Sequence, residues 1–228
     1  MSKRSAGVWQ RADSVRQQQG GLADYDAALA LDPESVDALY NRGVTLFGQG
    51  DLAAARADLE QVIALAPQYA EAYEGLGTVS DLEGNPSLAL TYYGQAIALD
   101  PQNPRFYYNR AVTYNSLQNY PAALADADRA LALDPAYGSA LFMRAFALDE
   151  LNRTEEALRS YADFLAVTLD LPEDYETSDL LDSPGLRNPR IDHARVRMLT
   201  IAFEMQGLDV TVEVGEDGDL IVTLNEVP

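Results

Sequence analysis

A proline recurs in this chain at an interval of 34 residues. The four positions are Pro33, Pro67, Pro101 and Pro135, and each closes a variant of the phrase Leu-Ala-Leu-Asp-Pro. A self-similarity of 34 residues is the period of solenoids built from helix–turn–helix units. Because one such unit cannot bury its apolar face alone, neighbouring units must stack on one another. The period therefore predicts a stack of helix pairs, a class of fold that mostly presents surfaces to other molecules.

Small side chains recur at two further positions of the period. Position 8 is glycine or alanine and position 20 is alanine, and the members are Gly43, Gly77, Ala111 and Ala145, and Ala55, Ala89, Ala123 and Ala157. Small residues on facing helices allow a close approach, and aromatic side chains fill the space beside them. The closing proline cannot continue a helix, so it separates one helix pair from the next.

These phrases resemble the tetratricopeptide repeat, with Ala127 as a departure at position 24, where the family has a larger residue. The resemblance covers residues 5–171 and implies an all-α fold, a right-handed superhelical solenoid of helix pairs with a concave groove. The repeats are 5–35, 36–69, 70–103, 104–137 and 138–171. The first is three residues short, with Gly20 and Gly21 where the missing turn would be, and we expect it to cap the solenoid.

The repeat pattern stops at Pro172. Residues 172–190 contain several prolines among acidic residues and are expected to form a connector. Residues 191–206 carry an apolar stripe at helical spacing. Residues 208–225 then alternate between apolar and polar side chains around a glycine-bounded acidic turn, which predicts a β-hairpin. The chain is therefore expected to end in a small helix-plus-hairpin unit over residues 191–228.

The apolar face of this hairpin can be buried in three ways. A lone two-stranded hairpin is only marginally stable in water, so its apolar face must be covered. The helix at 191–206 can pack on it, and the unit then caps the solenoid. Its free strand edges can instead pair with another chain, which gives a homodimer through residues 208–225. In the third form, the unit folds back into the groove of the solenoid.

Charge and cysteine content narrow the classes of partner. The chain has 228 residues and a formal charge of −20, which opposes binding to nucleic acid or to an anionic membrane and favours a neutral or basic partner. Adaptation to salt or a GC-rich genome is the alternative explanation of the composition. The absence of cysteine excludes disulfides and thiol chemistry. No apolar run long enough to span a bilayer and no secretory signal is visible, so we expect a cytoplasmic protein.

The sequence offers no residue pattern typical of catalysis. His193 is the single histidine, and its position near the start of the C-terminal helix predicts a surface residue. The acidic turn at 216–219 lacks the ligand spacing of a calcium loop. No glycine-rich phosphate-binding motif follows a strand. We therefore expect neither cofactor nor metal nor catalytic residue; an enzyme with perturbed carboxylates is the alternative that only coordinates can test.

In tetratricopeptide arrays the first helix of each repeat lines the groove, and the resemblance implies that role for twelve residues here. They are Tyr40, Asn41, Phe47, Glu71, Glu74, Asp81, Arg105, Tyr108, Asn109, Asn115, Phe142 and Phe146. Aromatic rings supply contact area at low entropic cost, and asparagine can pair with a peptide backbone. Packing against the adjacent repeat is the alternative role of Tyr40 and Tyr108.

One subtype of the family grips acidic chaperone tails with lysine, arginine and asparagine, but Glu74 and Thr78 stand here where lysine and asparagine are needed. The expected function is a non-catalytic protein–protein interaction module, a scaffold or adaptor that binds a neutral or basic peptide segment in the groove. The alternative is a structural protein that self-assembles through the C-terminal hairpin.

Two positions of the repeat change together. Position 7 is arginine in repeats one, two, four and five, position 23 is aspartate in three of these, and repeat three has Leu76 and Tyr92 instead. An unpaired guanidinium at the seam between two helices would be costly. The predicted ion pairs are Arg11–Asp24, Arg42–Asp58 and Arg110–Asp126. In repeat five Arg144 faces Ser160, and its partner is left open.

Overall fold

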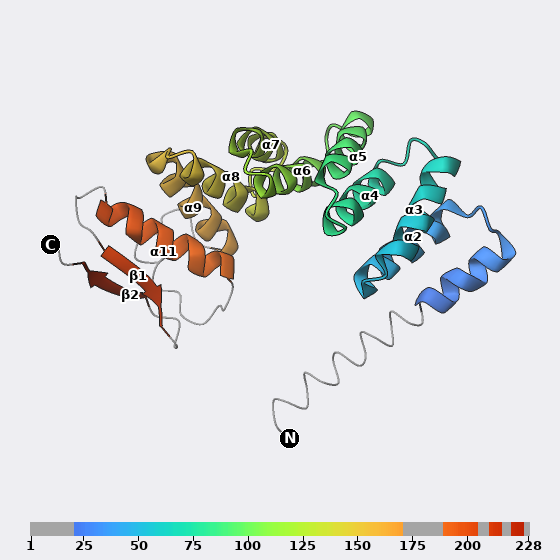
Figure 1. The fold of residues 1–228 in the computed structure, drawn as a ribbon, viewed down its shortest axis with the longest axis horizontal. Helices are drawn as coiled ribbons and strands as arrows, with labels where there is room; N and C mark the ends of the chain where they lie inside the picture. Colours follow the sequence, from blue (N-terminus) through green and yellow to red (C-terminus); the bar gives the residue numbers. More distant parts are fainter. Residues whose placement is uncertain (1–20, 171–188, 205–209, 216–219, 226–228) are drawn as a thin grey trace, which may run out of the picture. The chain divides into compact units, whose positions relative to one another are not determined.

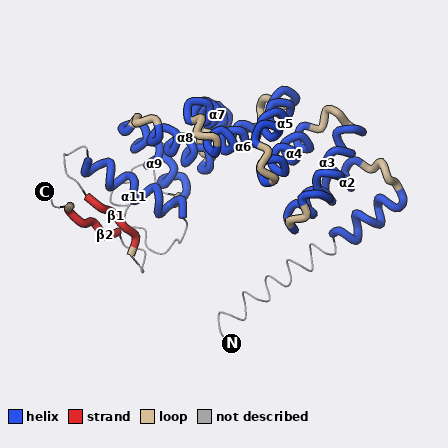
Figure 2. Tube along the Cα trace, in the orientation of Figure 1, coloured by secondary structure: helices blue, strands red, loops and turns tan. Residues whose placement is uncertain are grey.

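The computed structural model describes residues 21–170, 189–204, 210–215 and 220–225. The chain divides into two compact units, residues 1–102 (unit 1) and residues 103–228 (unit 2). Figure 1 shows the ribbon with its helices and strands labelled. Helices dominate both units, and the described strands are confined to the C-terminal segment (Figure 2). Among the described residues no helix combines the length and apolarity needed to cross a membrane.

Each unit is built from consecutive helix pairs. In unit 1 a helix at residues 21–31 precedes the pairs α2 (Val36–Gln49) with α3 (Leu52–Leu65) and α4 (Ala70–Leu82) with α5 (Pro86–Leu99). In unit 2, α6 (Pro104–Ser116) pairs with α7 (Tyr120–Leu133), and α8 (Gly138–Glu150) pairs with α9 (Thr154–Thr168). Successive pairs stack through α3 on α4 and through α7 on α8. The predicted all-α fold of repeated helix pairs is confirmed.

Two kinds of turn separate the helices, and both recur with the period of the repeat. Within a repeat one residue adopts the left-handed conformation: Gly50 with φ 84°, Gly84 with φ 78°, and Gln118 and Asn152 with φ 57°. Glycine enters this region without a steric cost, and asparagine tolerates it. Between repeats the residue before the proline orders the turn, since Asp100 Oδ1 accepts a hydrogen bond of 3.0 Å from the amide of Gln102.

The small residues at positions 8 and 20 form the tight contact within a pair. The position-20 alanines Ala55, Ala89, Ala123 and Ala157 are all fully buried. In repeat three a Cβ added at Gly77 would lie 2.6 Å from Cε1 of Tyr93, so only glycine leaves room for this ring. The Tyr93 hydroxyl donates a 3.1 Å hydrogen bond to Thr78 Oγ1, which satisfies its polar end inside the core.

The predicted ion pairs at the helix–helix seam are confirmed where the structure describes both partners. Arg42 donates two hydrogen bonds of 2.7 Å to the carboxylate of Asp58. Arg110 binds Asp126 in the same two-pronged geometry, again with 2.7 Å for both bonds. Both aspartates are buried, so the fork of the guanidinium fixes the register of one helix against the other.

The first and third repeats give different outcomes. Arg11 lies outside the described residues, so its pairing with Asp24 stays a prediction. Gly21 is helical, and one glycine costs a helix only about 1 kcal/mol, which the helical residues after it outweigh; Gly20 lies outside the described residues. In repeat three Leu76 is fully buried and Tyr92 packs on the same core, so an apolar pair takes the place of the ion pair.

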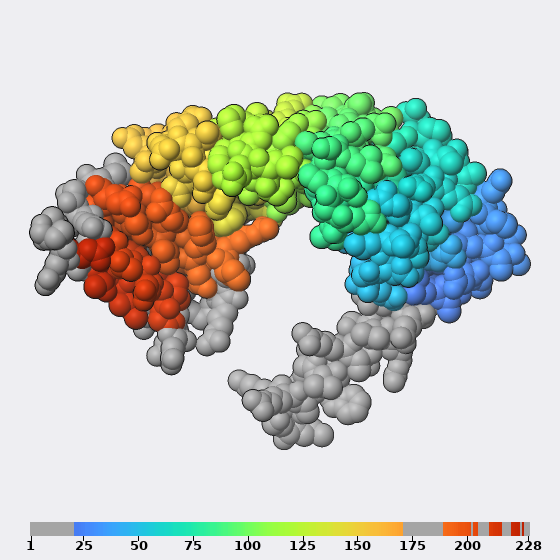
Figure 3. All heavy atoms as spheres, in the orientation of Figure 1, coloured from blue at the N-terminus to red at the C-terminus, as the bar shows by residue number. Residues whose placement is uncertain are grey.

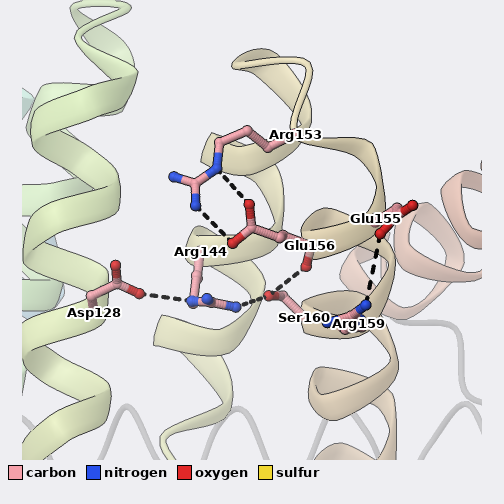
Figure 4. A network of polar contacts seen from close by, with 7 residues as sticks. All are labelled: Asp128, Arg144, Arg153, Glu155, Glu156, Arg159 and Ser160. Carbon is pink, nitrogen blue, oxygen red and sulfur yellow. Dashed lines mark hydrogen bonds and ion pairs between the residues drawn. The ribbon is translucent and has the colours of Figure 1, made fainter.

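The seam arginines also bind the preceding repeat, which the sequence did not predict. Arg144 of α8 forms a 2.7 Å ion pair with Asp128 of α7 and donates a hydrogen bond to Ser160 of α9 (Figure 4). Arg42 likewise forms a 2.7 Å ion pair with Asp26 of the helix before α2. Position 7 therefore connects three successive helices in these repeats.

The C-terminal segment forms the expected helix and hairpin. The helix α11 (Pro189–Glu204) packs on α9, and the strand β1 (Val210–Val214) packs on α11 (Figure 3). β1 pairs antiparallel with β2 (Leu220–Leu224), and Val212 lies opposite Val222. The helix starts two residues earlier than predicted, and residues 205 and 206 of the predicted helix lie outside the described residues. Leu208 and the turn at 216–219 lie outside the described residues.

The C-terminal helix completes the core of repeat five. Its residues Ile191, Ala194 and Met198 are buried in one cluster with the apolar side chains of α8 and α9. Val210 and Val212 of β1 are also buried. The helix α11 therefore covers both the last repeat and one face of the hairpin.

Candidate functional site

The twelve predicted groove residues fall on four first helices, two in each unit. The unit 1 face consists of Tyr40, Asn41 and Phe47 of α2 and Glu71, Glu74 and Asp81 of α4. The unit 2 face consists of Arg105, Tyr108, Asn109 and Asn115 of α6 and Phe142 and Phe146 of α8. The two faces differ in charge and in what contacts them, so they are described in turn.

Aromatic side chains anchor the unit 1 face to the core. The ring centroids of Tyr40 and Tyr69 lie 5.0 Å apart, with the planes tilted by 42°. Tyr40 and Phe47 are half-buried and pack on the cluster shared by α2, α3 and α4. Asn41 is exposed, and its amide donates a 2.8 Å hydrogen bond to the carbonyl of Asp37 one turn earlier. On this face, therefore, Tyr40 and Phe47 pack partly on the core, while Asn41 is open to solvent.

Carboxylates of α4 act on two neighbouring tyrosines, Tyr69 just before this helix and Tyr93 on α5. Burial raises the pKa of Tyr69, and the negative charge of Glu71 raises it further. Burial likewise raises the pKa of Tyr93, and the charges of Asp81 and Glu74 act in the same direction. A phenolate is disfavoured where negative charge is already present. Both tyrosines therefore stay neutral hydrogen-bonding groups in an acidic environment.

The described part of unit 1 has few positive charges to balance these carboxylates. Residues 21–102 contain thirteen aspartate and glutamate residues and two arginines. Both arginines already form ion pairs: Arg42 with Asp26 and Asp58, and Arg56 with Glu60 and Glu83. The unit 1 face is therefore negatively charged, with aromatic rings beside the carboxylates.

The unit 2 face repeats the aromatic pair but not the acids. The ring centroids of Tyr108 and Tyr137 lie 5.4 Å apart. These two tyrosines follow Tyr40 and Tyr69 in the sequence by two repeat periods, which is 68 residues. Arg105 is exposed and lies over the ring of Phe106, with its guanidinium carbon 5.9 Å from the ring centroid.

The two asparagines of α6 are half-buried. The buried side-chain oxygen Oδ1 of Asn115 has no hydrogen-bond partner among the described residues. The backbone carbonyl of Asn109 accepts a hydrogen bond from the hydroxyl of Thr113.

The first turn of α11 contacts the unit 2 face directly. Arg190 donates a 3.1 Å hydrogen bond to the hydroxyl of Tyr108 and a 3.2 Å hydrogen bond to Oγ of Ser139. Its guanidinium carbon lies 5.5 Å from the ring centroid of Phe142, which is cation–π geometry. This part of the predicted groove therefore already holds a cationic side chain of the same chain.

His193 corrects the expectation of a surface histidine. Its ring is half-buried between Phe142, Phe146 and Tyr161, with ring centroids 5.6, 5.9 and 5.8 Å away. Its Nε2 lies 3.2 Å from the Tyr161 hydroxyl. Burial lowers the pKa of His193 below its usual value, although the charge of Asp149 opposes part of this effect. The prediction is wrong because the start of α11 faces α8 and α9.

The contacts of α11 are the functional feature that sequence reasoning missed. Arg197 donates hydrogen bonds of 2.7 and 2.6 Å to the two carboxylate oxygens of Asp149. Arg190, His193 and Arg197 follow one another at helical spacing, and this was the available signal. No group of three or more histidine, aspartate or glutamate side chains is placed to hold a metal ion in the described part of the chain.

Comparison with known families identifies the class of protein. Tetratricopeptide-repeat family profiles match residues 10–74, 83–138 and 139–167. The chain therefore belongs to the tetratricopeptide-repeat family. A comparison with curated protein sequences finds no match.

Solved structures with the same fold include several tetratricopeptide-repeat proteins. MamA is 22% identical with a TM-score of 0.63, over 70% of this chain and 94% of MamA. YrrB, "a TPR protein with an unusual peptide-binding site", is 22% identical with a TM-score of 0.56, over 71% of this chain and 83% of YrrB. The first TPR of Spaghetti (RPAP3), bound to HSP90 peptide SRMEEVD, is 23% identical with a TM-score of 0.50, over 61% of this chain and 94% of that chain. At these identities the likeness establishes the fold.

Proposed function

We propose that this protein is a non-catalytic interaction module that holds a neutral or basic segment of a partner protein on the unit 1 face. The observation that carries the proposal is the tyrosine pair Tyr40–Tyr69 within electrostatic reach of Glu71, with Glu74 three residues further along α4. Tyrosine rings offer a rigid contact surface, and carboxylates attract and orient a cationic segment. Both arginines in the described part of unit 1 are engaged in other ion pairs, which supports the same polarity.

The structural relatives support peptide binding as the mode of interaction. YrrB has a peptide-binding site, and the Spaghetti domain holds a peptide of a chaperone. That peptide carries two glutamates and a C-terminal aspartate, so it is acidic. Here Glu74 and Thr78 stand where the family's clamp for acidic tails has lysine and asparagine. An acidic segment would meet like charge on this face, so the proposed partner segment is neutral or basic.

The contacts of α11 narrow the proposed binding surface. Tyr108 and Phe142 contact Arg190, and Phe146 contacts His193. A partner on the unit 2 face would have to compete with these intramolecular contacts. We therefore assign the partner segment to the unit 1 face and leave unit 2 a mainly structural part.

Affinity capture with three forms of the full chain tests this proposal. The wild type is compared with the double variant Glu71→Gln/Glu74→Gln and with Glu34→Gln/Glu60→Gln. The control removes two charges from the same unit, at exposed positions outside the face. We expect a specific partner with the wild type and with the control, and its loss from the Glu71→Gln/Glu74→Gln variant. Identical partners from all three forms would contradict the proposal, as would capture of no partner by the wild type.

Self-assembly through the hairpin is a second candidate function. The observation that favours it is apolar exposure on β2, where Ile221 is 53% and Val222 41% exposed. In the described residues β1 and β2 pair only with each other, so each leaves one edge for a strand of a second copy. Sedimentation of the full chain should then show a dimer that Ile221→Lys converts to a monomer. A wild-type chain that stays monomeric at high concentration would exclude this candidate.

A further inference from the structure

We propose that the unit 1 face recognises an arginine side chain of the partner segment, in a seat formed by Tyr40, Glu71 and Glu74. This inference rests on the proposed function and names the chemical group that the face selects. It is carried by a guanidinium that already occupies the corresponding seat in unit 2.

Arg190 shows how a guanidinium sits against two consecutive first helices of this chain. Its contacts include the hydroxyl of Tyr108 at 3.1 Å, Oγ of Ser139 at 3.2 Å and the ring of Phe142 at 5.5 Å. In the frame of the repeat these are position 5 of one repeat and positions 2 and 5 of the next. The three positions converge on one cationic group although they come from α6 and α8.

The same three positions occur in unit 1, two repeats earlier. Subtracting 68 from each residue number gives Tyr40, Glu71 and Glu74. The local frame is similar, since Tyr40 pairs with Tyr69 at 5.0 Å and Tyr108 with Tyr137 at 5.4 Å, with interplanar angles of 42° and 61°. The seat is therefore defined by repeat positions and a tyrosine pair that recur in both units, and its occupant is visible in unit 2.

The substitutions between the two seats strengthen the attraction for a cation. Where unit 2 has Ser139 and Phe142, unit 1 has the carboxylates of Glu71 and Glu74. Asp37 stands at the position that Arg105 has in unit 2, so a like charge is replaced by an opposite one. The pKa of Tyr69 is raised by burial and by the charges of Glu71 and Asp37, which places both carboxylates within electrostatic reach of the aromatic pair.

Arginine fits this seat better than lysine does. A guanidinium is planar, presents five N–H donors in a fixed fork and stacks on aromatic rings, whereas an ammonium group is a compact and strongly hydrated point charge. Two carboxylates and the hydroxyl of Tyr40 offer several acceptor oxygens, and carboxylates are the groups that a guanidinium fork binds best. The seat should therefore discriminate between two groups of equal charge.

Short glycine–serine peptides test this directly against the full, isotope-labelled chain by NMR titration. The peptides are blocked at both ends and carry one central arginine, lysine or citrulline. We expect the arginine peptide to shift the resonances of Tyr40, Glu71 and Glu74, to bind at least about fivefold more tightly than the lysine peptide, and the neutral citrulline peptide not to bind. Glu71→Gln/Glu74→Gln should weaken arginine binding about tenfold or more, and Glu34→Gln/Glu60→Gln less than about twofold.

Three results would overturn the inference. They are equal affinity for arginine and lysine, resonance shifts that map elsewhere on the chain, and an unchanged affinity in Glu71→Gln/Glu74→Gln whose spectrum shows it to be folded. A captured partner that needs the unit 1 face, combined with failure of the arginine peptide, would refute the arginine seat and leave the proposed function standing. Failure to capture any partner would refute the proposed function itself.

Discussion

Replacing Asp126 by asparagine isolates the role of the seam ion pair. Asp126 is buried on α7, and its two carboxylate oxygens accept bonds of 2.7 Å from Arg110 of α6. Asparagine has nearly the same shape but keeps only one acceptor and no charge. The Asp126→Asn variant therefore leaves the guanidinium at the helix–helix seam without its counter-charge, at little cost in packing.

The expected magnitude follows from the burial of the two partners. Removing one member of a buried ion pair costs about 3–5 kcal/mol. The Arg110 side chain retains 23% exposure and that of Asp126 9%, so we expect the lower end, about 3 kcal/mol. Asp58→Asn should cost less, about 1–2 kcal/mol, because Arg42 keeps its 2.7 Å ion pair with Asp26.

Native-state hydrogen exchange of the full chain is the suitable assay, since stacked repeats need not unfold in one step. A loss of about 3 kcal/mol corresponds to about 100-fold faster exchange of the α6 and α7 amides. The control is Glu155→Gln, which breaks a surface pair of 3.7 Å with Arg159 in which both side chains are more than 70% exposed. It should change exchange less than about twofold.

Replacing both members of the ion pair should cost much less stability than removing one of them. Arg110→Leu/Asp126→Tyr transplants the pair that repeat three carries as Leu76 and Tyr92. Because replacing a buried ion pair by apolar side chains is often neutral, exchange in α6 and α7 should stay within about fivefold of wild type. A double variant less stable than Asp126→Asn, or an Asp126→Asn variant with wild-type exchange, would refute the argument.

Three further predictions concern single side chains and the C-terminal helix. Gly77→Ala should destabilise α4 and α5 by about 1–3 kcal/mol in thermal unfolding, because the added Cβ would meet the Tyr93 ring. The control Gly94→Ala has open space around it and should stabilise α5 by up to about 1 kcal/mol. His193 has a lowered pKa when folded, so the stability it contributes is complete above its unfolded pKa of about 6.5 and is lost as the pH falls through its folded pKa. His193→Gln should therefore flatten the stability of unit 2 between about pH 7.5 and 5.5, measured by urea unfolding, and an unchanged pH profile would refute this. Deleting residues 189–228 should expose the apolar surface of α8 and α9 and lower the melting temperature or solubility; an unchanged, monodisperse chain would contradict a covering role for α11.

The sequence predicted the repeat architecture because one pattern is written into it several times. Comparison of the repeats with one another was enough to pair Arg42 with Asp58 and Arg110 with Asp126, since both positions change together in repeat three. The period also located the turns, because each needs a proline or a residue that tolerates the left-handed conformation.

Contacts made once in the chain were beyond this kind of reasoning. Arg190 meets Tyr108 across 82 residues, and nothing periodic relates the two positions. The position of His193 near the start of a helix predicts a surface residue, and the apolar stripe of that helix does not tell which polar neighbours border its contact with α8 and α9. The division of the predicted groove into an acidic face and a face that contacts α11 also depended on these non-periodic residues.

The salt dependence of partner binding tests the central claim most directly. The segment of the captured partner that contacts unit 1 would be titrated calorimetrically into the full chain over a range of about 0.05–0.5 M salt. If the carboxylates of the unit 1 face attract a cationic segment, the Kd should rise steadily with ionic strength, and the rise should be much smaller in Glu71→Gln/Glu74→Gln. A Kd that is insensitive to salt, or a bound segment that is itself acidic, would contradict the account.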